Sequence, residues 1–212
     1  MSCCDPRGCD RFFGGRFARR MAGRYRRRGL DPTARKLVAF LERQGIEGAT
    51  VLEIGGGVGE IHLELLRRGA ERAVNLELSP AYDADAARLA AEAGVQGRIE
   101  RRMHDIAVDP DAIAPADVVV LHRVVCCYPD YERLLGAAAA HARRLLVFSH
   151  PRRNLLSRLI VGVENLGFRL ARREFRVFAH PPAAMVAALR ERGLEPRFAD
   201  RGFAWEAHGL SR

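Results

Sequence analysis

The sequence is poor in lysine, in aromatic side chains and in long apolar runs, and these shortages exclude several classes of protein. Lys36 is the only lysine in 212 residues, and aromatic residues make up 7%. No apolar run approaches the roughly 18 residues that a membrane-spanning helix needs. The N-terminus also lacks the apolar core of a secretory signal. We therefore expect a protein without a membrane span or a secretory signal.

Cysteine is odd in number and poorly spaced for disulfides. Of the five cysteines, Cys3 and Cys4 are neighbours, as are Cys126 and Cys127, while Cys9 stands alone. This arrangement indicates a reducing compartment, so we expect a cytoplasmic location. No C-x-x-C pair is present, so no metal site is predicted, and the second pair is more simply two small buried side chains.

The net charge of +9 lies mainly at one end of the chain. Residues 1–30 hold nine arginines against two aspartates, so the other 182 residues are nearly neutral. Such a body does not suit a protein that coats nucleic acid. Within this basic leader, Phe13, Phe17 and Met21 recur at helical spacing and predict an amphipathic helix that packs on the main domain, residues 31–212.

Strands and helices alternate through the main domain. Asp31 followed by Pro32 is a typical helix start. With helices between them, short apolar strands are predicted at 51–54, 73–78, 98–103, 117–121 and 145–149. Two further strands, 195–199 and 202–208, form a hairpin. The pattern predicts a parallel sheet covered by helices on both faces, with an antiparallel last strand.

The most informative segment is the glycine-rich loop at 51–60, which reads VLEIGGGVGE. A buried strand runs into glycines and then into a helix, so the backbone can approach a ligand closely and offer free N–H groups. A dinucleotide fingerprint that begins at Gly55 requires glycine where Glu60 stands. The acid Glu53 precedes the glycines; it would repel a pyrophosphate but suits a cationic amino-acid group.

Two further acids follow the next two predicted strands. Glu77 ends the second strand, where a carboxylate accepts hydrogen bonds from both ribose hydroxyls. Asp105 follows the third strand and is placed to reach an adenine amino group. A generic glycine turn with solvent-facing acids is the alternative, and three acids in register disfavour it. The pattern therefore indicates a site for a nucleoside with an amino-acid end.

Four segments of this region resemble the motifs of class I S-adenosylmethionine-dependent methyltransferases. They read VLEIGGGVGE, NLELS, HDI and ADVVVLHRVV, and the resemblance covers about residues 32–150. It implies an α/β fold, a Rossmann-like three-layer αβα sandwich with seven mostly parallel strands, and S-adenosyl-L-methionine as the cofactor. The residues expected to line the cofactor are Glu53, Gly55, Gly56, Gly57, Glu77, Leu78, Asp105, Ile106 and His122.

The flanking segments are similar to those of the magnesium-protoporphyrin O-methyltransferase group. The matches are the leading run from Cys9 to Leu30, the segment VCCYP, and the later SHP and RVFAH. This resemblance implies that the leader is a lid over a small-molecule acceptor, with transfer to oxygen. The catalytic candidates are Tyr25, His122, Cys127 and Tyr128.

One position departs from that group. Cys127 stands where the group has a histidine, and a thiol, whose ordinary pKa is about 8.5, is a poorer general base near pH 7 than an imidazole. The porphyrin substrate is therefore not carried over. We expect Arg123 to hold an acidic substrate through a bidentate contact, and His150 to contribute to substrate binding. Trp205 is expected in the core.

Three other functions stay open from the sequence. The basic leader with Phe12 and Tyr25 would suit a nucleic-acid methyltransferase, although no Asn/Asp-Pro-Pro-aromatic motif follows the fourth strand. The cysteines would suit a thiophilic metal or metalloid substrate. A cofactor-binding protein without catalytic activity is the third. We predict a methyltransferase for a small, acidic acceptor rather than for nucleic acid.

Overall fold

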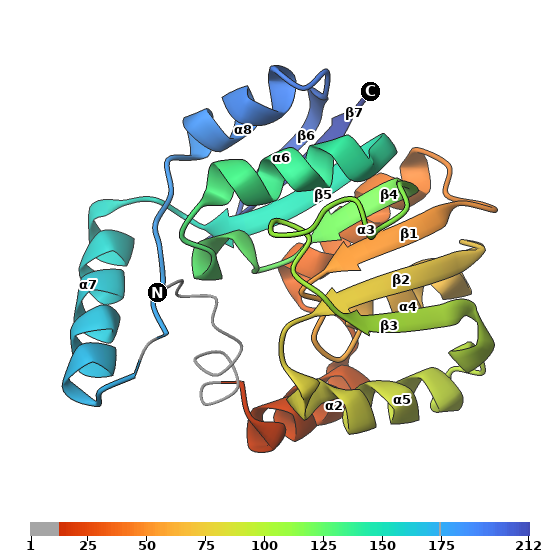
Figure 1. The fold of residues 1–212 in the computed structure, drawn as a ribbon, viewed down its shortest axis with the longest axis horizontal. Helices are drawn as coiled ribbons and strands as arrows, with labels where there is room; N and C mark the ends of the chain where they lie inside the picture. Colours follow the sequence, from red (N-terminus) through yellow and green to blue (C-terminus); the bar gives the residue numbers. More distant parts are fainter. Residues whose placement is uncertain (1–12, 174) are drawn as a thin grey trace.

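The computed structural model describes residues 13–173 and 175–212, which form three layers around one sheet (Figure 1). The strands lie in the order β3-β2-β1-β4-β5-β7-β6. β7 is antiparallel to both of its neighbours, and the pairs among β1 to β5 are parallel. The predicted seven-stranded sheet is confirmed, with bounds β1 Thr50–Ile54, β2 Arg72–Glu77, β3 Ile99–Met103, β4 Ala116–Leu121, β5 Ala142–Pro151, β6 Glu195–Arg201 and β7 Trp205–Ser211.

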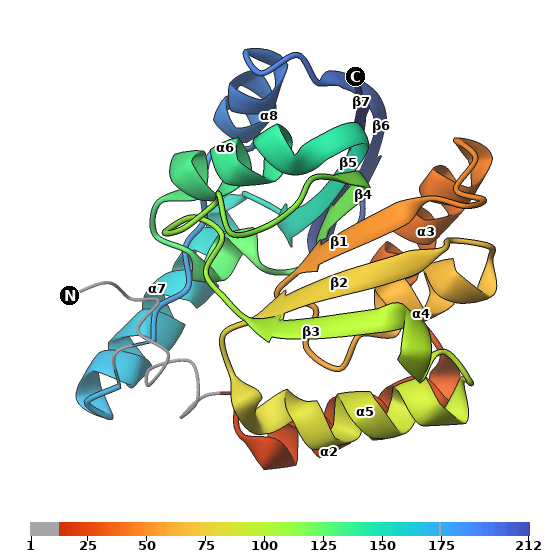
Figure 2. The ribbon, with the colours of Figure 1, turned by 45° about the vertical axis from the view of Figure 1, so that its right-hand side comes forward.

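Helices cover both faces of the sheet. Helices α2 to α5 pack on one face, and α6 and α8 pack on the other. Figure 2 shows α2 and α5 side by side beneath β3. α7 stands beyond the carboxyl ends of the strands (Figure 1). The helix bounds are α2 Gly15–Arg28, α3 Pro32–Arg43, α4 Glu60–Arg67, α5 Asp83–Glu92, α6 Tyr131–His141, α7 Leu155–Leu170 and α8 Pro182–Arg190, with short 3₁₀ turns η1 Pro80–Tyr82, η2 Gln96–Arg98 and η3 Val125–Cys127.

The central strand β4 explains why the sheet must be covered on both sides. Its side chains alternate between two apolar clusters, with Val118 and Val120 on the α2–α5 face and Val119 and Leu121 on the other. All four are fully buried. Burial of such side chains contributes about 1.5–3 kcal/mol each, so the continuous apolar run stabilises a strand with helices on both sides.

The junction between leader and main domain is a capped helix start, as the sequence predicts. The Asp31 carboxylate accepts hydrogen bonds from the backbone N–H groups of Thr33 and Ala34 at the start of α3. The leader helix α2 is part of the core, because Ala18 and Ala22 are fully buried against it. The predicted packing of an amphipathic leader helix is thus confirmed. The leader cysteines lie outside the described residues.

Several strand boundaries differ from the expectation: β5 begins at Ala142 instead of 145, and β7 spans Trp205–Ser211 instead of 202–208. β5 continues to Pro151, beyond the predicted end at 149, because it pairs with β7 along its length and Pro151 lies opposite Trp205. The hairpin turn is formed by 202–204 rather than by residues 200–201, since β6 runs through Arg201. Cross-strand pairing, which no local pattern reports, extends both strands.

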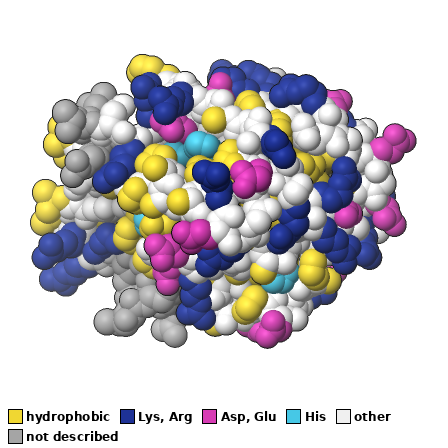
Figure 3. Space-filling model, turned by 90° about the horizontal axis from the view of Figure 1, so that it is seen from above, with side chains coloured by type: hydrophobic (Ala, Val, Ile, Leu, Met, Phe, Trp, Pro, Cys, Tyr) yellow, Lys and Arg dark blue, Asp and Glu magenta, His cyan; other side chains and the backbone are white. Residues whose placement is uncertain are grey.

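The described residues include no candidate membrane span, and surface charges of both signs are mixed on one face of the molecule (Figure 3). No helix in the described part of the chain is both long and apolar enough to cross a bilayer. On the face seen in Figure 3, arginine and lysine side chains are interspersed with acidic ones rather than gathered in one basic patch. That distribution agrees with the nearly neutral main domain.

Candidate active site

A cavity of about 680 Å³ lies at the carboxyl-terminal edge of the sheet. The strand order reverses between β1 and β4, which is where a crevice opens in sheets of this kind. The volume falls in the range of small-molecule sites. Ile160 and Glu164 of α7 contribute to its wall, and the leader adds three apolar side chains, Phe13, Phe17 and Met21.

The glycine loop forms the floor of this cavity between β1 and α4. Gly55 has a φ of 64°, and a side chain there would place its Cβ 2.6 Å from a methyl carbon of Val124. Gly57 also has a positive φ, of 55°, and its N–H donates a 2.8 Å hydrogen bond to the Glu77 carboxylate. Glycine is required at both positions, and the loop is tied directly to the end of β2.

Glu77 is fixed by the backbone around it. Besides Gly57, the N–H groups of Leu78 and Ser79 donate to its carboxylate at 2.8 and 3.2 Å. Burial raises the pKa of Glu77, and these N–H groups offset the rise only in part. The Glu77 carboxylate lines the cavity in a fixed orientation, and its oxygens can accept further hydrogen bonds from a ligand.

Asp105 and Tyr128, predicted for different roles, lie together. The Tyr128 hydroxyl donates to the Asp105 carboxylate at 3.1 Å, and the N–H of Ala107 donates at 3.0 Å. Both Asp105 and Tyr128 line the cavity, as does the buried side chain of Ile106. Tyr128 therefore orients a carboxylate of the wall.

Glu53 is bonded within the protein. It is 2% exposed, accepts a hydrogen bond from the His62 N–H at 3.1 Å, and lies 2.6 Å from His62 Nδ1. Although Glu53 borders the cavity, its carboxylate is directed to the start of α4. The sequence did not predict this pairing, because it depends on how the buried side of α4 packs against β1.

His122 is bonded through both of its ring nitrogens. Nε2 lies 2.9 Å from the Asp31 carboxylate and Nδ1 lies 2.9 Å from the Ser149 hydroxyl. Burial alone would raise the pKa of Asp31, but the hydrogen bond and charge of His122, with the charge of Arg123, hold it well below its usual range. His122 borders the cavity as a positioned, hydrogen-bonded imidazole.

Arg123 is held in a rare backbone conformation beside His122. Its φ is 60°, and its N–H donates to the Ser149 hydroxyl at 3.0 Å. The guanidinium carbon lies 4.6 Å from the centre of the Trp205 ring, and one terminal nitrogen lies 3.4 Å from Asp31. Its Nε is buried and has no hydrogen-bond partner among the described residues. Arg123 lines the cavity and thus places beside it a buried donor that no described residue satisfies.

Glu60 was not predicted as a site residue, although it lines the cavity. Both of its carboxylate oxygens accept hydrogen bonds from one nitrogen of Arg24 in the leader helix, at 3.0 and 2.9 Å. Burial raises the pKa of Glu60, and the charge of Arg24 lowers it only in part. The position of Glu60 directly after the glycines could have marked it as a site residue. Its pairing with Arg24 could not have been predicted from sequence spacing.

The predicted substrate and catalytic residues do not all converge. His122, Arg123, Cys127 and Tyr128 line the cavity. His150 lies on the other face of β5, against His208, and is not among the cavity-lining residues. Cys127 is partly exposed, and Cys126 beside it is buried. Trp205, expected in the core, lines the cavity instead.

Tyr25 is also separate from the cavity. Its hydroxyl donates to Glu64 at 2.7 Å and accepts a hydrogen bond from Arg67 at 2.9 Å. Burial and the hydrogen bond to Glu64 raise the pKa of Tyr25. The hydroxyl lies in a network between α2 and α4, so its surroundings are those of a contact between helices.

Two opposed sets of groups thus border one cavity. We call the glycine loop with Glu77 and Asp105 the acidic wall, and His122, Arg123 and Trp205 the arginine wall. The acidic wall supplies acceptors, and the arginine wall supplies a cation with an unsatisfied donor. This sheet order, with the glycine loop after β1 and the acids after β2 and β3, defines a Rossmann-like methyltransferase fold.

The sequence model of the family described as "Methyltransferase domain" matches residues 22–208, and the chain belongs to this family. A curated relative, the ribosomal protein L11 methyltransferase of Edwardsiella ictaluri (strain 93-146), is 30% identical over 118 residues. That match covers 51% of this chain and 39% of the relative, so the chain matches well under half of that protein's length.

Solved methyltransferases share the fold at low sequence identity. Magnesium protoporphyrin IX methyltransferase from Synechocystis PCC 6803, crystallised with SAH, superposes with a TM-score of 0.69 at 20% identity, over 85% of this chain and 82% of that one. A 1,6-didemethyltoxoflavin-N1-methyltransferase from Burkholderia thailandensis gives 0.62 at 17% identity, over 85% and 78%. The fold common to these proteins is the one described above.

Proposed function

We propose that this enzyme transfers a methyl group from S-adenosyl-L-methionine to a carboxylate oxygen of a small acidic molecule. The observation that carries the proposal is Arg123, whose Nε is a buried, unsatisfied donor in the wall of an otherwise largely apolar cavity. A bidentate contact with a carboxylate would satisfy it.

The residues present fit S-adenosyl-L-methionine. The acidic wall holds two carboxylates at the ends of neighbouring strands, suited to ribose hydroxyls at Glu77 and to an adenine amino group at Asp105. The glycine loop borders the cavity, and glycine is needed at position 55 because a Cβ there would lie 2.6 Å from a Val124 methyl carbon and force the loop to move. When bound, the cofactor supplies an electrophilic methyl carbon on a sulfonium.

The protein's part in the reaction is alignment. Transfer to an acceptor oxygen would break the carbon–sulfur bond and leave its electron pair on sulfur, so the residues of the site need only hold the reactants in line. Arg123 orients the acceptor, while Ser149 fixes the Arg123 backbone and His122 together. Because both ring nitrogens of His122 are already engaged, it acts as a positioning residue. An ionised carboxylate needs no base, which agrees with this arrangement.

The leader forms part of the acceptor site in this proposal. Phe13, Phe17 and Met21 line the cavity, and Arg24 binds Glu60 beneath it. We therefore treat residues 1–30 as a leader over the site and residues 31–212 as the catalytic domain. The neighbouring cysteines Cys126 and Cys127 suit a reducing compartment, so we propose a cytoplasmic location.

Calorimetry with S-adenosylmethionine and its demethylated product tests the cofactor, and a panel of acids tests the acceptor. We expect cofactor binding, and methyl transfer to carboxylic acids but not to the matched primary amides. Mass spectrometry of a ligand that co-purifies would identify the acceptor. Failure of cofactor binding would overturn the proposal, and transfer to the amides or to oligonucleotides would overturn its acceptor class.

A further inference from the structure

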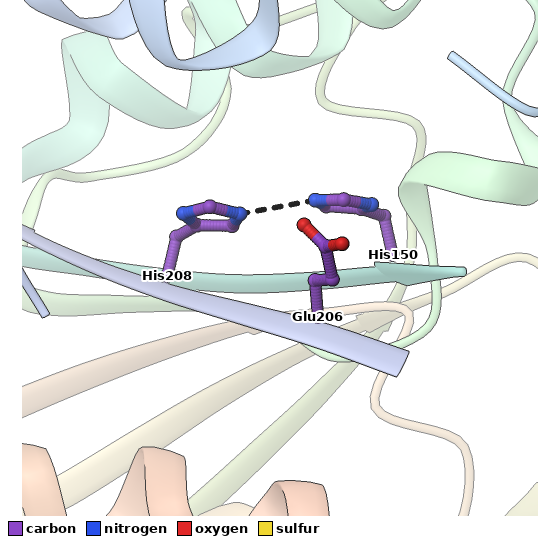
Figure 4. Close-up of side chains that lie close together, drawn as sticks. All are labelled: His150, Glu206 and His208. Atoms are coloured by element: carbon purple, nitrogen blue, oxygen red, sulfur yellow. Dashed lines mark hydrogen bonds between the residues drawn. The ribbon is translucent and has the colours of Figure 1, made fainter. Parts of the chain in front are cut away.

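A second group of polar side chains lies on the opposite side of β5 from Ser149. His150 on β5 is paired in register with Glu206 on β7, and His208 follows two residues later on the same face. Figure 4 shows the three side chains close together above the two strands. His150 and Glu206 are buried, and His208 is half-buried. None of the three lines the cavity described above.

Their donor atoms have the spacing of a metal site. One nitrogen or oxygen from each residue lies within 4.8 Å of the others, and the two histidine Nε2 atoms are 3.1 Å apart. Two imidazole nitrogens bound to one tetrahedral zinc ion, at about 2.0–2.1 Å each, are separated by roughly 3.3 Å. In the structure these two nitrogens are hydrogen-bonded to each other, so an ion would enter by breaking that bond, with both rings turning toward a common point.

The surroundings fix the ring orientation that a ligand needs. His150 Nδ1 donates to the Pro151 carbonyl at 2.9 Å, so its Nε2 carries a lone pair directed at His208. Metal-binding histidines commonly donate their second N–H to a carbonyl in this way. His208 stacks on Phe148 with ring centres 4.9 Å apart, which holds the second ring.

The carboxylate of Glu206 is incompletely satisfied. Its nearest cation is Arg152, at 3.9 Å, and no described residue donates a hydrogen bond to it. A cation between the three side chains would give this carboxylate a charged partner closer than Arg152. The three groups thus lie together, with His208 Nε2–H donating to His150 Nε2, and an ion would replace that proton between them.

We propose that His150, Glu206 and His208 bind a divalent transition-metal ion of the zinc type. Two histidines and a carboxylate are a known donor set for such ions, with water or another ligand at the remaining position. The ion would fasten the end of β5 to the start of β7. Pro151 and Trp205, the next residues along these strands, line the cavity, so the ion would steady the wall on which Arg123 rests.

In a second cluster of the described residues, which has similar spacing, the donors are held by groups outside the cluster. Asp31, Glu60 and His122 also lie within 4.8 Å. There, however, His122 is bonded through both nitrogens, Asp31 caps a helix, and Glu60 is bound by Arg24. A metal would have to displace these partners, so we assign the ion to the β5–β7 cluster.

Zinc titration of the metal-free, tag-free full chain tests the site. We expect one zinc ion per chain by calorimetry and a higher melting temperature with zinc. His208→Gln and Glu206→Gln should each weaken binding by about 100-fold or more, since loss of a ligand exceeds the 10–100-fold effect of outer-sphere changes. Cobalt in place of zinc should give visible absorption in the wild type and lose it in both variants.

Two matched controls locate the ion. His180→Gln removes a neighbouring histidine that contacts the Tyr128 carbonyl, and His122→Gln removes the histidine of the second cluster. Both should bind zinc as the wild type does. Absence of stoichiometric zinc binding, or loss in His122→Gln with retention in Glu206→Gln, would overturn the proposal. Because Glu206→Gln preserves size, it answers the question even where His208→Gln unfolds.

Discussion

The acidic wall and the arginine wall border the same cavity, but they are assembled from different parts of the chain. Glu77 is held by Leu78 and Ser79, which follow it in the sequence, and by Gly57 of the glycine loop after the neighbouring strand β1. Arg123 and His122 instead depend on Asp31, Ser149 and Trp205, which come from the leader junction and from other strands. The first wall is local and the second is long-range.

This difference suggests a division of labour. A wall made by strand ends and their own loops persists as long as the sheet does, which suits a cofactor that never changes. A wall assembled from a helix cap, a neighbouring strand and a hairpin can be altered by changing any one of them. Four substitutions and one pH series test whether the two walls differ in this way, and they follow in order of decreasing effect.

Asp31→Ala should cost the most stability, about 2–4 kcal/mol, because it removes a helix cap and leaves the buried His122 nitrogen unpaired. Asp130→Ala is the matched control, since Asp130 caps α6 through the Arg133 N–H at an exposed position. It should cost only about 1 kcal/mol. Urea unfolding measures both, and equal losses would show that the long-range contact adds nothing.

The same carboxylate gives a pH dependence. The pKa of Asp31 is lowered in the folded protein, so its contribution is fully present above the unfolded value of about 3.9 and is lost as the pH falls further. The stability advantage of the wild type over Asp31→Asn should therefore shrink below about pH 4. An advantage that stays constant between pH 7 and pH 3 would contradict the lowered pKa.

Glu77→Ala tests the acidic wall. Loss of the ribose contacts should cost about 2–3 kcal/mol of cofactor binding, which is roughly 30- to 150-fold in Kd by calorimetry. Glu100→Ala, on β3, provides the control, because Glu100 is exposed and pairs only with Arg102 among the described residues. Unchanged cofactor binding in Glu77→Ala would contradict the proposal that the acidic wall binds the cofactor.

Arg123→Lys tests the arginine wall. Lysine keeps the charge but loses the planar pair of donors and the stacking on Trp205, so the KM for the acceptor should rise about tenfold. The Kd of the cofactor should stay as in the wild type. If cofactor binding weakened as much as acceptor binding, the two walls would not be functionally separate.

Tyr25→Phe should change the protein least. The lost hydroxyl contact with Glu64 should cost about 1 kcal/mol of stability, while turnover stays within about twofold of the wild type. Thermal unfolding measures the change in stability, and steady-state kinetics measures the change in turnover, so together they distinguish a structural from a catalytic role. A loss of turnover by about two orders of magnitude would instead restore the catalytic role that the family resemblance implies for Tyr25.

The sequence was sufficient for the parts built from local rules. The order of strands and helices, the antiparallel last strand and the capped start of α3 follow from periodicity and from capping and turn residues. Glu77 and Asp105 were found because a parallel sheet brings the carboxyl ends of its strands to one edge. Both line the cavity as expected.

The rest could not be predicted because it depends on distant pairing. The contact of Arg123 with Trp205 joins the end of β4 to β7, and that of Glu60 with Arg24 joins α4 to the leader helix. His150 was expected at the substrate because the segment SHP is similar to one in the magnesium-protoporphyrin O-methyltransferase group. The extra length of β5, set by its pairing with β7, directs it to the other face.

The position of β7 also has a consequence for biosynthesis. β6 is made before β7, yet in the finished sheet β7 lies between β6 and β5. On the ribosome, β6 has therefore no strand to join until the following residues emerge, whereas β1 to β5 can pair as they appear. Until β7 inserts, β5 presents an open edge that nascent-chain chaperones or premature pairing could occupy. Trp205, Glu206 and His208 arrive with that last insertion.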